Sequence, residues 1–94
     1  MHPLIAQQQS VCAIAVTYHP DSDFPVRMRR IIGQVGALVI VDNGSAAGTL
    51  AMLQGLAASP STTLVSNAEN LGVACALNIG IRRAGKVALY AGPV

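Results

Sequence analysis

Two short, wholly apolar runs stand out in the pattern of hydrophobic and polar positions. They cover residues 11–16 and 37–41, and both are rich in β-branched residues. Each run is too short for a typical helix and lacks the alternation of a strand with one wet face. Because strands buried on both faces have this pattern, both runs predict strands inside a parallel sheet.

Helical periodicity follows each apolar run. Asp23 offers an N-cap for a first helix, whose apolar pattern continues until Gly36. Ser45 is placed to cap a second helix that closes near Pro60, and a third helix is expected after the polar loop at 67–72. The residues expected on the buried faces are Val26, Ile31, Ile32 and Val35, then Leu50, Leu53 and Leu56, then Val73, Leu77, Ile81 and Ala84.

Two further strands are predicted at residues 62–66 and 87–91. The alternation of strands and helices predicts an α/β, Rossmann-like fold, with a mainly parallel sheet of about four strands and helices on both faces. Right-handed crossovers make 3-2-1-4 the expected strand order, and ligands then bind at the carboxyl ends of the strands. Residues 1–10 are expected to be a flexible N-terminus, and residues 11–94 a single partial domain.

Composition narrows the class of protein. An apolar content of 52% with 11% charged residues is far from that of a disordered chain, and 94 residues suit one small domain. A chain this short and apolar is expected to leave apolar surface uncovered, which predicts a homo-oligomer formed through that surface or an edge strand. The net charge of +2 and the few aromatic residues argue against a nucleic-acid partner.

No apolar stretch reaches the roughly 18 residues that a transmembrane segment needs, and residues 1–10 lack the pattern of a secretory signal. We therefore expect a cytoplasmic protein, with the inner membrane surface as a further possible location. Cys12 and Cys75 lack metal-ligand spacing, which favours two small buried residues over a disulfide or metal site.

The basic residues form two clusters near predicted helix ends. They can be solvated charges that complement the helix dipole, or a surface for anionic phosphates or lipid headgroups. The clusters are Arg27, Arg29 and Arg30, and then Arg82, Arg83 and Lys86.

Three polar segments follow predicted strands and should share one edge of the sheet: residues 17–20, 42–45 and 67–72. A pyrimidine base presents hydrogen-bond acceptors and one donor along one edge of its ring, and Asp42 and Asn43 are candidates to bind this edge of the base. The alternative for this pair is plain turn chemistry. Gly72 precedes a predicted helix, so the backbone N–H groups there are free to face a diphosphate.

The three segments together resemble glycosyltransferase family 2. The form of the second and third segments is most similar to the rhamnosyltransferase branch, and the resemblance covers about residues 11–84. The matching residues are Thr17, Tyr18 and Pro20, then Val41, Asp42, Asn43, Gly44 and Ser45, then Asn67, Asn70, Leu71, Gly72, Ala74, Ala76, Asn78 and Gly80. Asn78 and Gly80 can also be read as positions that permit close packing of the helix on the sheet.

The resemblance implies the nucleotide-binding half of a GT-A fold. It implies transfer of a sugar, rhamnose in this branch, from a dTDP- or UDP-linked donor to a polysaccharide or lipid-linked acceptor. The implied nucleotide-sugar-binding residues are Thr17, Tyr18, Asp42, Asn43, Asn70 and Gly72. His19 replaces the usual Asn of the family and is given no catalytic role.

Family members also carry an acidic pair after the fourth strand that holds Mg²⁺ or Mn²⁺, and later an acidic general base. This sequence has no Asp or Glu after Glu69. We therefore expect no catalytic residue, no metal ligand and no cofactor in this chain, which would be a truncated and inactive part of the enzyme. The alternative is a non-catalytic module that binds nucleotide or self-associates.

Overall fold

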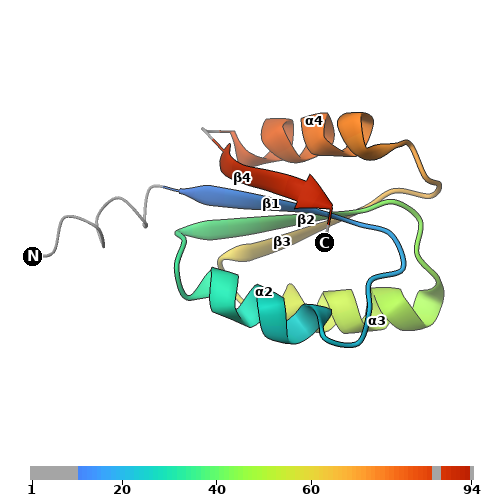
Figure 1. Ribbon diagram of the computed structural model, residues 1–94, viewed down its shortest axis with the longest axis horizontal. Coiled ribbons are helices and arrows are strands. Elements are labelled where there is room, and N and C mark those ends of the chain that lie inside the picture. Colours follow the sequence, from blue (N-terminus) through green and yellow to red (C-terminus); the bar gives the residue numbers. More distant parts are fainter. Residues whose placement is uncertain (1–10, 86–87, 94) are drawn as a thin grey trace, which may run out of the picture.

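The computed structural model describes residues 11–85 and 88–93 (Figure 1). The segment predicted to be flexible, residues 1–10, lies outside the described residues, as does Lys86. The elements in chain order are β1 (Cys12–Thr17), α2 (Phe24–Ile32), β2 (Ala37–Asp42), α3 (Ala47–Leu56), β3 (Thr62–Ser66), α4 (Val73–Ala84) and β4 (Ala88–Pro93).

The strands run parallel, in the order β3-β2-β1-β4. In the register of the first three strands, Thr17 lies beside Asp42, and Asp42 beside Ser66. The carboxyl ends of β1, β2 and β3 therefore form one continuous edge, which we call the strand-tip edge. Each helix begins at this edge and returns to the opposite one (Figure 1).

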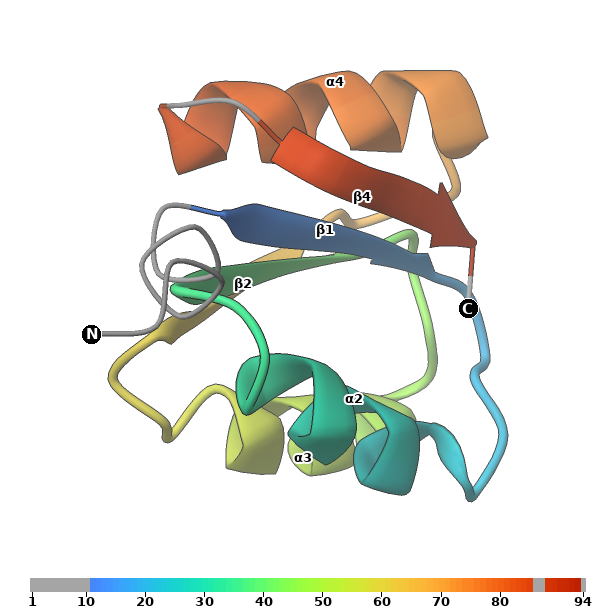
Figure 2. The same cartoon turned by 60° about the vertical axis from the view of Figure 1, so that its left-hand side comes forward.

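The sheet separates two apolar cores, with α2 and α3 on one face and α4 on the other (Figure 2). Successive side chains of a strand point to opposite faces, so a continuous apolar run supplies both cores. Ala13 and Ala15 of β1 pack with α2 and α3, whereas Ile14 and Val16 pack with α4. The predicted α/β fold, a parallel sheet covered by helices, is confirmed.

The helix α4 approaches the sheet closely at Gly80. A Cβ atom on Gly80 would lie 2.6 Å from Cγ2 of Ile14 and 3.1 Å from Cγ2 of Val41. The helix can take this position because Gly80 has no side chain. The expected packing role of Gly80 is confirmed, but the same expectation for Asn78 is wrong, because Asn78 is exposed.

The buried face of α4 agrees with the predicted one only in part, because Leu77 and Ala84 pack against the core as expected but Val73 and Ile81 do not. Val73 and Ile81 are 49% and 42% exposed, while Ala76 and Gly80 are buried against the sheet. Ala76 and Gly80 are small and allow the helix backbone to come close to the sheet, so the rotation of α4 is set by this close contact together with the packing of Leu77 and Ile79. Cys75 consequently faces outward, so the expectation that both cysteines are buried holds only for Cys12.

Two helix ends also differ from the predictions. The helix α2 ends at Ile32 with Gly33 as C-cap, before the predicted stop at Gly36. The predicted N-cap role of Ser45 is wrong, because α3 begins after Ala46 without a side-chain cap. Val26 was also expected to be buried but is 47% exposed.

Within the described residues, no helix is both long and apolar enough to span a membrane.

Candidate functional site

A buried carboxylate organises one half of the strand-tip edge. Asp42 is 0% exposed at the end of β2. Its Oδ1 accepts hydrogen bonds from Thr17 Oγ1 at 2.7 Å and Ser45 Oγ at 2.6 Å, and its Oδ2 accepts the Ser45 backbone N–H at 2.8 Å. Both carboxylate oxygens are thus bound by protein donors, which offsets the cost of burying the charge.

The same network extends into the loop after β1. The backbone N–H of His19 donates to Ser45 Oγ at 2.8 Å, and His19 has a positive φ of 48°. This conformation costs a non-glycine residue about 1–2 kcal/mol, so the bond that the His19 N–H donates to Ser45 Oγ helps to hold the turn. The neighbouring Tyr18 is 53% exposed, with its ring centroid 4.1 Å from that of His19. We call Thr17, His19, Asp42 and Ser45 the Asp42 network; it fixes the loop that presents the Tyr18 ring.

A buried amide organises the other half of the edge. Asn43 is 2% exposed, and its Oδ1 accepts from Asn67 Nδ2 at 2.9 Å and from the Leu71 N–H at 3.4 Å. Its Nδ2 donates to the backbone carbonyl oxygen of Gly72 at 3.1 Å. These four residues form what we call the Asn43 network. It joins the tip of β2 to the whole loop that leads into α4.

The loop at residues 67–72 also rests on Gly44. The φ of Gly44 is +94°, and a Cβ atom there would lie 3.1 Å from the backbone Cα and C atoms of Glu69. Only glycine combines this backbone conformation with such a close approach. The turn after β2 therefore fixes the loop in two ways. The amide of Asn43 bonds to the loop, and Gly44, which has no side chain, lets the loop backbone come close.

The start of α4 offers unpaired backbone donors. Gly72 is the N-cap, has a φ of 85° and makes no side-chain cap bond, while its own N–H donates to Asn70 Oδ1 at 2.8 Å. The first turn of α4 holds no acidic residue. Free N–H groups and the positive end of the helix dipole suit an anionic group at this position.

The structure brings all six predicted site residues to the strand-tip edge, but in two environments. Thr17, Asp42 and Asn43 are buried with their polar groups bound inside the protein. Tyr18, Asn70 and Gly72 are exposed. The first group therefore shapes the edge, and the second group is open to a ligand.

Sequence reasoning missed the roles of Ser45 and Asn67. Ser45 bonds back to Asp42 three residues earlier, a local side-chain-to-backbone pattern that competes with helix capping. That pattern was the available signal. No local signal marks Asn67, because its amide reaches Asn43, 24 residues earlier in the chain.

Apolar side chains frame the same edge. Tyr18, Leu71 and Val73 are 53%, 40% and 49% exposed, and they stand in the two loops that the networks hold and at the first residue of α4. A surface that combines exposed apolar groups with a few placed polar donors is typical of a small-molecule site. It suits a ligand with one flat apolar part and one anionic part.

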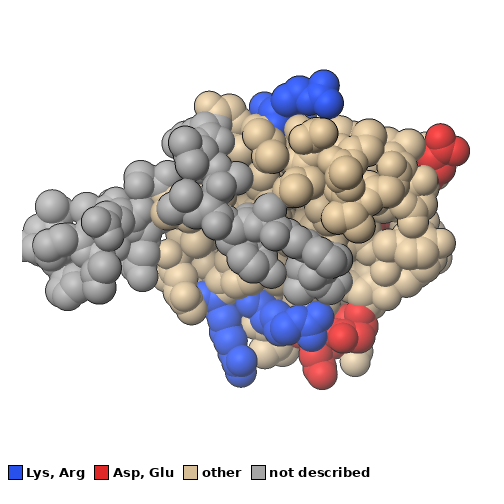
Figure 3. Space-filling view, turned by 45° about the horizontal axis from the view of Figure 1, so that its top comes forward, with Lys and Arg blue, Asp and Glu red and all other residues tan. Residues whose placement is uncertain are grey.

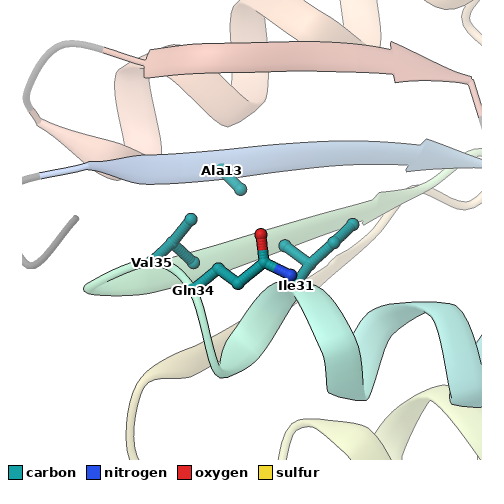
Figure 4. A pocket seen from close by; sticks show the side chains of 4 residues that line it. All are labelled: Ala13, Ile31, Gln34 and Val35. Atoms are coloured by element: carbon teal, nitrogen blue, oxygen red, sulfur yellow. The ribbon is translucent and has the colours of Figure 1, made fainter. Parts of the chain in front are cut away.

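Two surface hollows lie away from these residues. One is lined by Ala13, Ile31, Gln34 and Val35, beside the end of α2 (Figure 4). The other lies between β3 and α4 and is lined by Val65, Ile79, Arg82 and Arg83. Neither contains a predicted site residue.

The arginine pairs also stand apart from the strand-tip edge. Arg29 and Arg30 occupy the last turn of α2, and Arg82 and Arg83 the last turn of α4. The helices end at the opposite edge of the sheet, and Figure 3 shows the basic side chains on two separate sides of the molecule. Positive charge at a helix C-terminus complements the dipole.

The divalent ion implied by the family resemblance can be tested against the residues present. In the part of the chain that the structure describes, no three His, Cys, Asp or Glu side chains come together. Asp42, at the edge itself, already has both oxygens bound by protein donors. These residues do not fit a metal site.

Comparison with known protein families gives a match over most of the chain. The family model "Glycosyl transferase family 2" matches residues 13–89, a range that includes both networks and the whole of α4. No curated protein and no solved structure matches the chain significantly.

Proposed function

Because the chain belongs to glycosyl transferase family 2, we propose that its strand-tip edge binds the nucleotide part of a nucleotide-diphosphate sugar. One observation carries the proposal. The Asp42 and Asn43 networks hold two loops so that an exposed aromatic ring and the free N–H groups of a helix both lie along one edge of the sheet. An aromatic base and a diphosphate need these two kinds of partner.

In this proposal the exposed residues contact the nucleotide. The ring of Tyr18 stacks on the base, and the N–H groups that follow Gly72 face the diphosphate, with Asn70 holding the Gly72 amide. Thr17, Asp42 and Asn43 keep the edge in shape. Direct contact of Asp42 and Asn43 with the base stays a prediction. In this structure the polar groups of both residues are bound inside the protein, so such a contact would have to replace bonds that they already make.

The chemical identity of the donor rests on the resemblance of residues 41–45 and 67–80 to the rhamnosyltransferase branch. We take the donor to be dTDP- or UDP-linked, the sugar to be rhamnose and the acceptor to be a polysaccharide or a lipid-linked glycan. The proposed location is the cytoplasm or the inner membrane surface.

The proposal for this chain is donor binding without sugar transfer. The residues that the structure describes do not fit the Mg²⁺ or Mn²⁺ that we expect in the full-length family enzyme, and no acidic residue follows Glu69 in the sequence. Transfer of sugar by the purified chain with either ion added would contradict this part of the proposal.

Replacing Tyr18 by Ala is expected to weaken binding of UDP or dTDP about fivefold or more, because stacking of a base on an aromatic ring contributes about 1–3 kcal/mol. Isothermal titration calorimetry of the full chain measures the effect. Ile81→Ala is the control, since Ile81 is also exposed but lies in the last turn of α4. Equal losses in the two variants, or no saturable binding by the unmodified chain, would overturn the proposal.

A second candidate function is self-association. In the described sheet β3 pairs only with β2, and the strand has no charged residue or proline to discourage further pairing. A second copy could add its own β3 at this edge. A concentration-dependent dimer in sedimentation velocity, together with no nucleotide binding, would favour this function over the first.

A further inference from the structure

We infer that Asn43 is a positioning residue that sets the start of α4 for the diphosphate, and that its amide is required because it donates and accepts at once. The inference rests on the proposed nucleotide site. It assigns to Asn43 a role through the loop at residues 67–72, separate from any contact with the base.

The bonds of Asn43 use opposite ends of the amide. Oδ1 accepts from the side chain of Asn67 and from the backbone N–H of Leu71, while Nδ2 donates to the carbonyl oxygen of Gly72. A backbone N–H can only donate and a carbonyl can only accept, so the orientation of the amide is determined by its neighbours. A carboxylate would keep the two accepted bonds but would place an oxygen against the Gly72 carbonyl.

Apart from the bond that its carbonyl oxygen accepts from the Ala76 N–H inside α4, Gly72 has few other restraints. It caps α4 without a side-chain bond to the first turn, and its own N–H is bound by Asn70 from the same exposed loop. The bond from Asn43 Nδ2 ties Gly72 to the tip of a buried strand. The positions of the free N–H groups in the first turn of α4 therefore depend on this bond.

The two networks act on different parts of the edge. The Asp42 network bonds to His19 and so holds the loop of Tyr18, whereas the Asn43 network holds residues 67–72. Loss of the Asn43 amide should therefore affect the diphosphate part of a ligand more than the base. Gly44→Ala disturbs the same loop by another route, because the added Cβ meets the backbone of Glu69.

The test compares uridine with UDP on the full chain, using NMR titration for both. For Asn43→Asp near pH 8 we expect UDP binding to weaken roughly tenfold, in keeping with the loss of a buried hydrogen bond, and uridine binding to change less than about twofold. Gly44→Ala should show the same split. The control Gln54→Glu makes the same amide-to-carboxylate change at an exposed position of α3 and should leave the ratio of UDP to uridine affinity unchanged.

The pH dependence separates positioning from general destabilisation. Lowering the pH to about 5 protonates part of the introduced carboxyl group, because burial raises such a pKa above its usual value near 4. The protonated group can donate to the Gly72 carbonyl and accept from Leu71, so UDP affinity should recover relative to the unmodified chain at the same pH. Parallel loss of uridine and UDP binding without recovery at low pH would contradict the inference.

A measurement without ligand distinguishes this inference from the proposed function. In Asn43→Ala, which removes the acceptor of the Leu71 N–H and the donor to the Gly72 carbonyl oxygen, amide hydrogen exchange should become at least tenfold faster at Leu71 and Gly72 and stay unchanged at His19 and Ser45. If the unmodified chain binds neither uridine nor UDP, the proposed function fails, and unchanged exchange at Leu71 would overturn the positioning role as well. If the unmodified chain binds UDP but Asn43→Asp keeps the affinity ratio, the inference alone fails.

Discussion

Replacing Asp42 by Ala should lower the free energy of unfolding by about 3 kcal/mol or more, a large part of the roughly 5–15 kcal/mol of a small domain. The substitution leaves the two hydroxyl groups of Thr17 and Ser45 and the backbone N–H of Ser45 without their acceptor. Each unpaired buried donor costs about 1–3 kcal/mol. Asp42→Asn should cost less. The hydroxyl groups of Thr17 and Ser45 can turn to accept from the amide N–H groups of the new side chain, while its oxygen accepts the Ser45 backbone N–H.

Urea unfolding followed by circular dichroism measures this loss. Asp23→Ala is the matched control, because Asp23 is exposed and makes no side-chain cap bond at the start of α2. Its cost should stay below about 1 kcal/mol, the range of a charge near a helix N-terminus. Equal effects at the two positions would show that the Asp42 network contributes little to stability.

Replacing Gly80 by Ala should lower the free energy of unfolding by about 1–3 kcal/mol, although alanine favours a helix over glycine. The new Cβ atom would overlap Ile14 and approach Val41, and both residues are fully buried in the core beneath α4. The helix must then shift outward or the core must rearrange.

Gly55→Ala in α3 is the control for this prediction. A Cβ atom on Gly55 meets no atom within 4 Å, so the substitution should stabilise the protein by about 0.5–1 kcal/mol through helix propensity. Thermal unfolding of the two variants should thus shift in opposite directions. A gain of stability in Gly80→Ala would mean that α4 is not held against the sheet as described.

The strands could be predicted from the sequence because a continuous run of apolar residues indicates burial on both faces. An apolar run such as residues 37–41 is buried on both faces, and this burial needs no knowledge of the partner strands. The face of α4 could not be predicted in this way. Its rotation depends on how closely Gly80 approaches Ile14, a contact 66 residues apart in the chain, whereas periodicity registers only the size of the apolar side chains.

Some features of the site could likewise be predicted from the sequence, and others could not. That Thr17 and Asp42 lie together follows from the shared carboxyl edge of parallel strands, and the register pairs these residues directly. Which side chains remain open to a ligand does not follow from the sequence. Asp42 and Asn43 have the chemistry of ligand-binding residues. In the fold, Thr17 at the end of β1 and Ser45 in the turn after β2 bind the Asp42 carboxylate, and the loop after β3 binds the Asn43 amide.

An NMR titration of the full chain with UDP and dTDP tests the central claim most directly. We predict saturable shifts concentrated at the backbone amides of Tyr18, Leu71, Gly72 and Val73. Shifts confined to the helix ends at Arg29, Arg30, Arg82 and Arg83, or no saturation with either nucleotide, would contradict a nucleotide site at the strand tips.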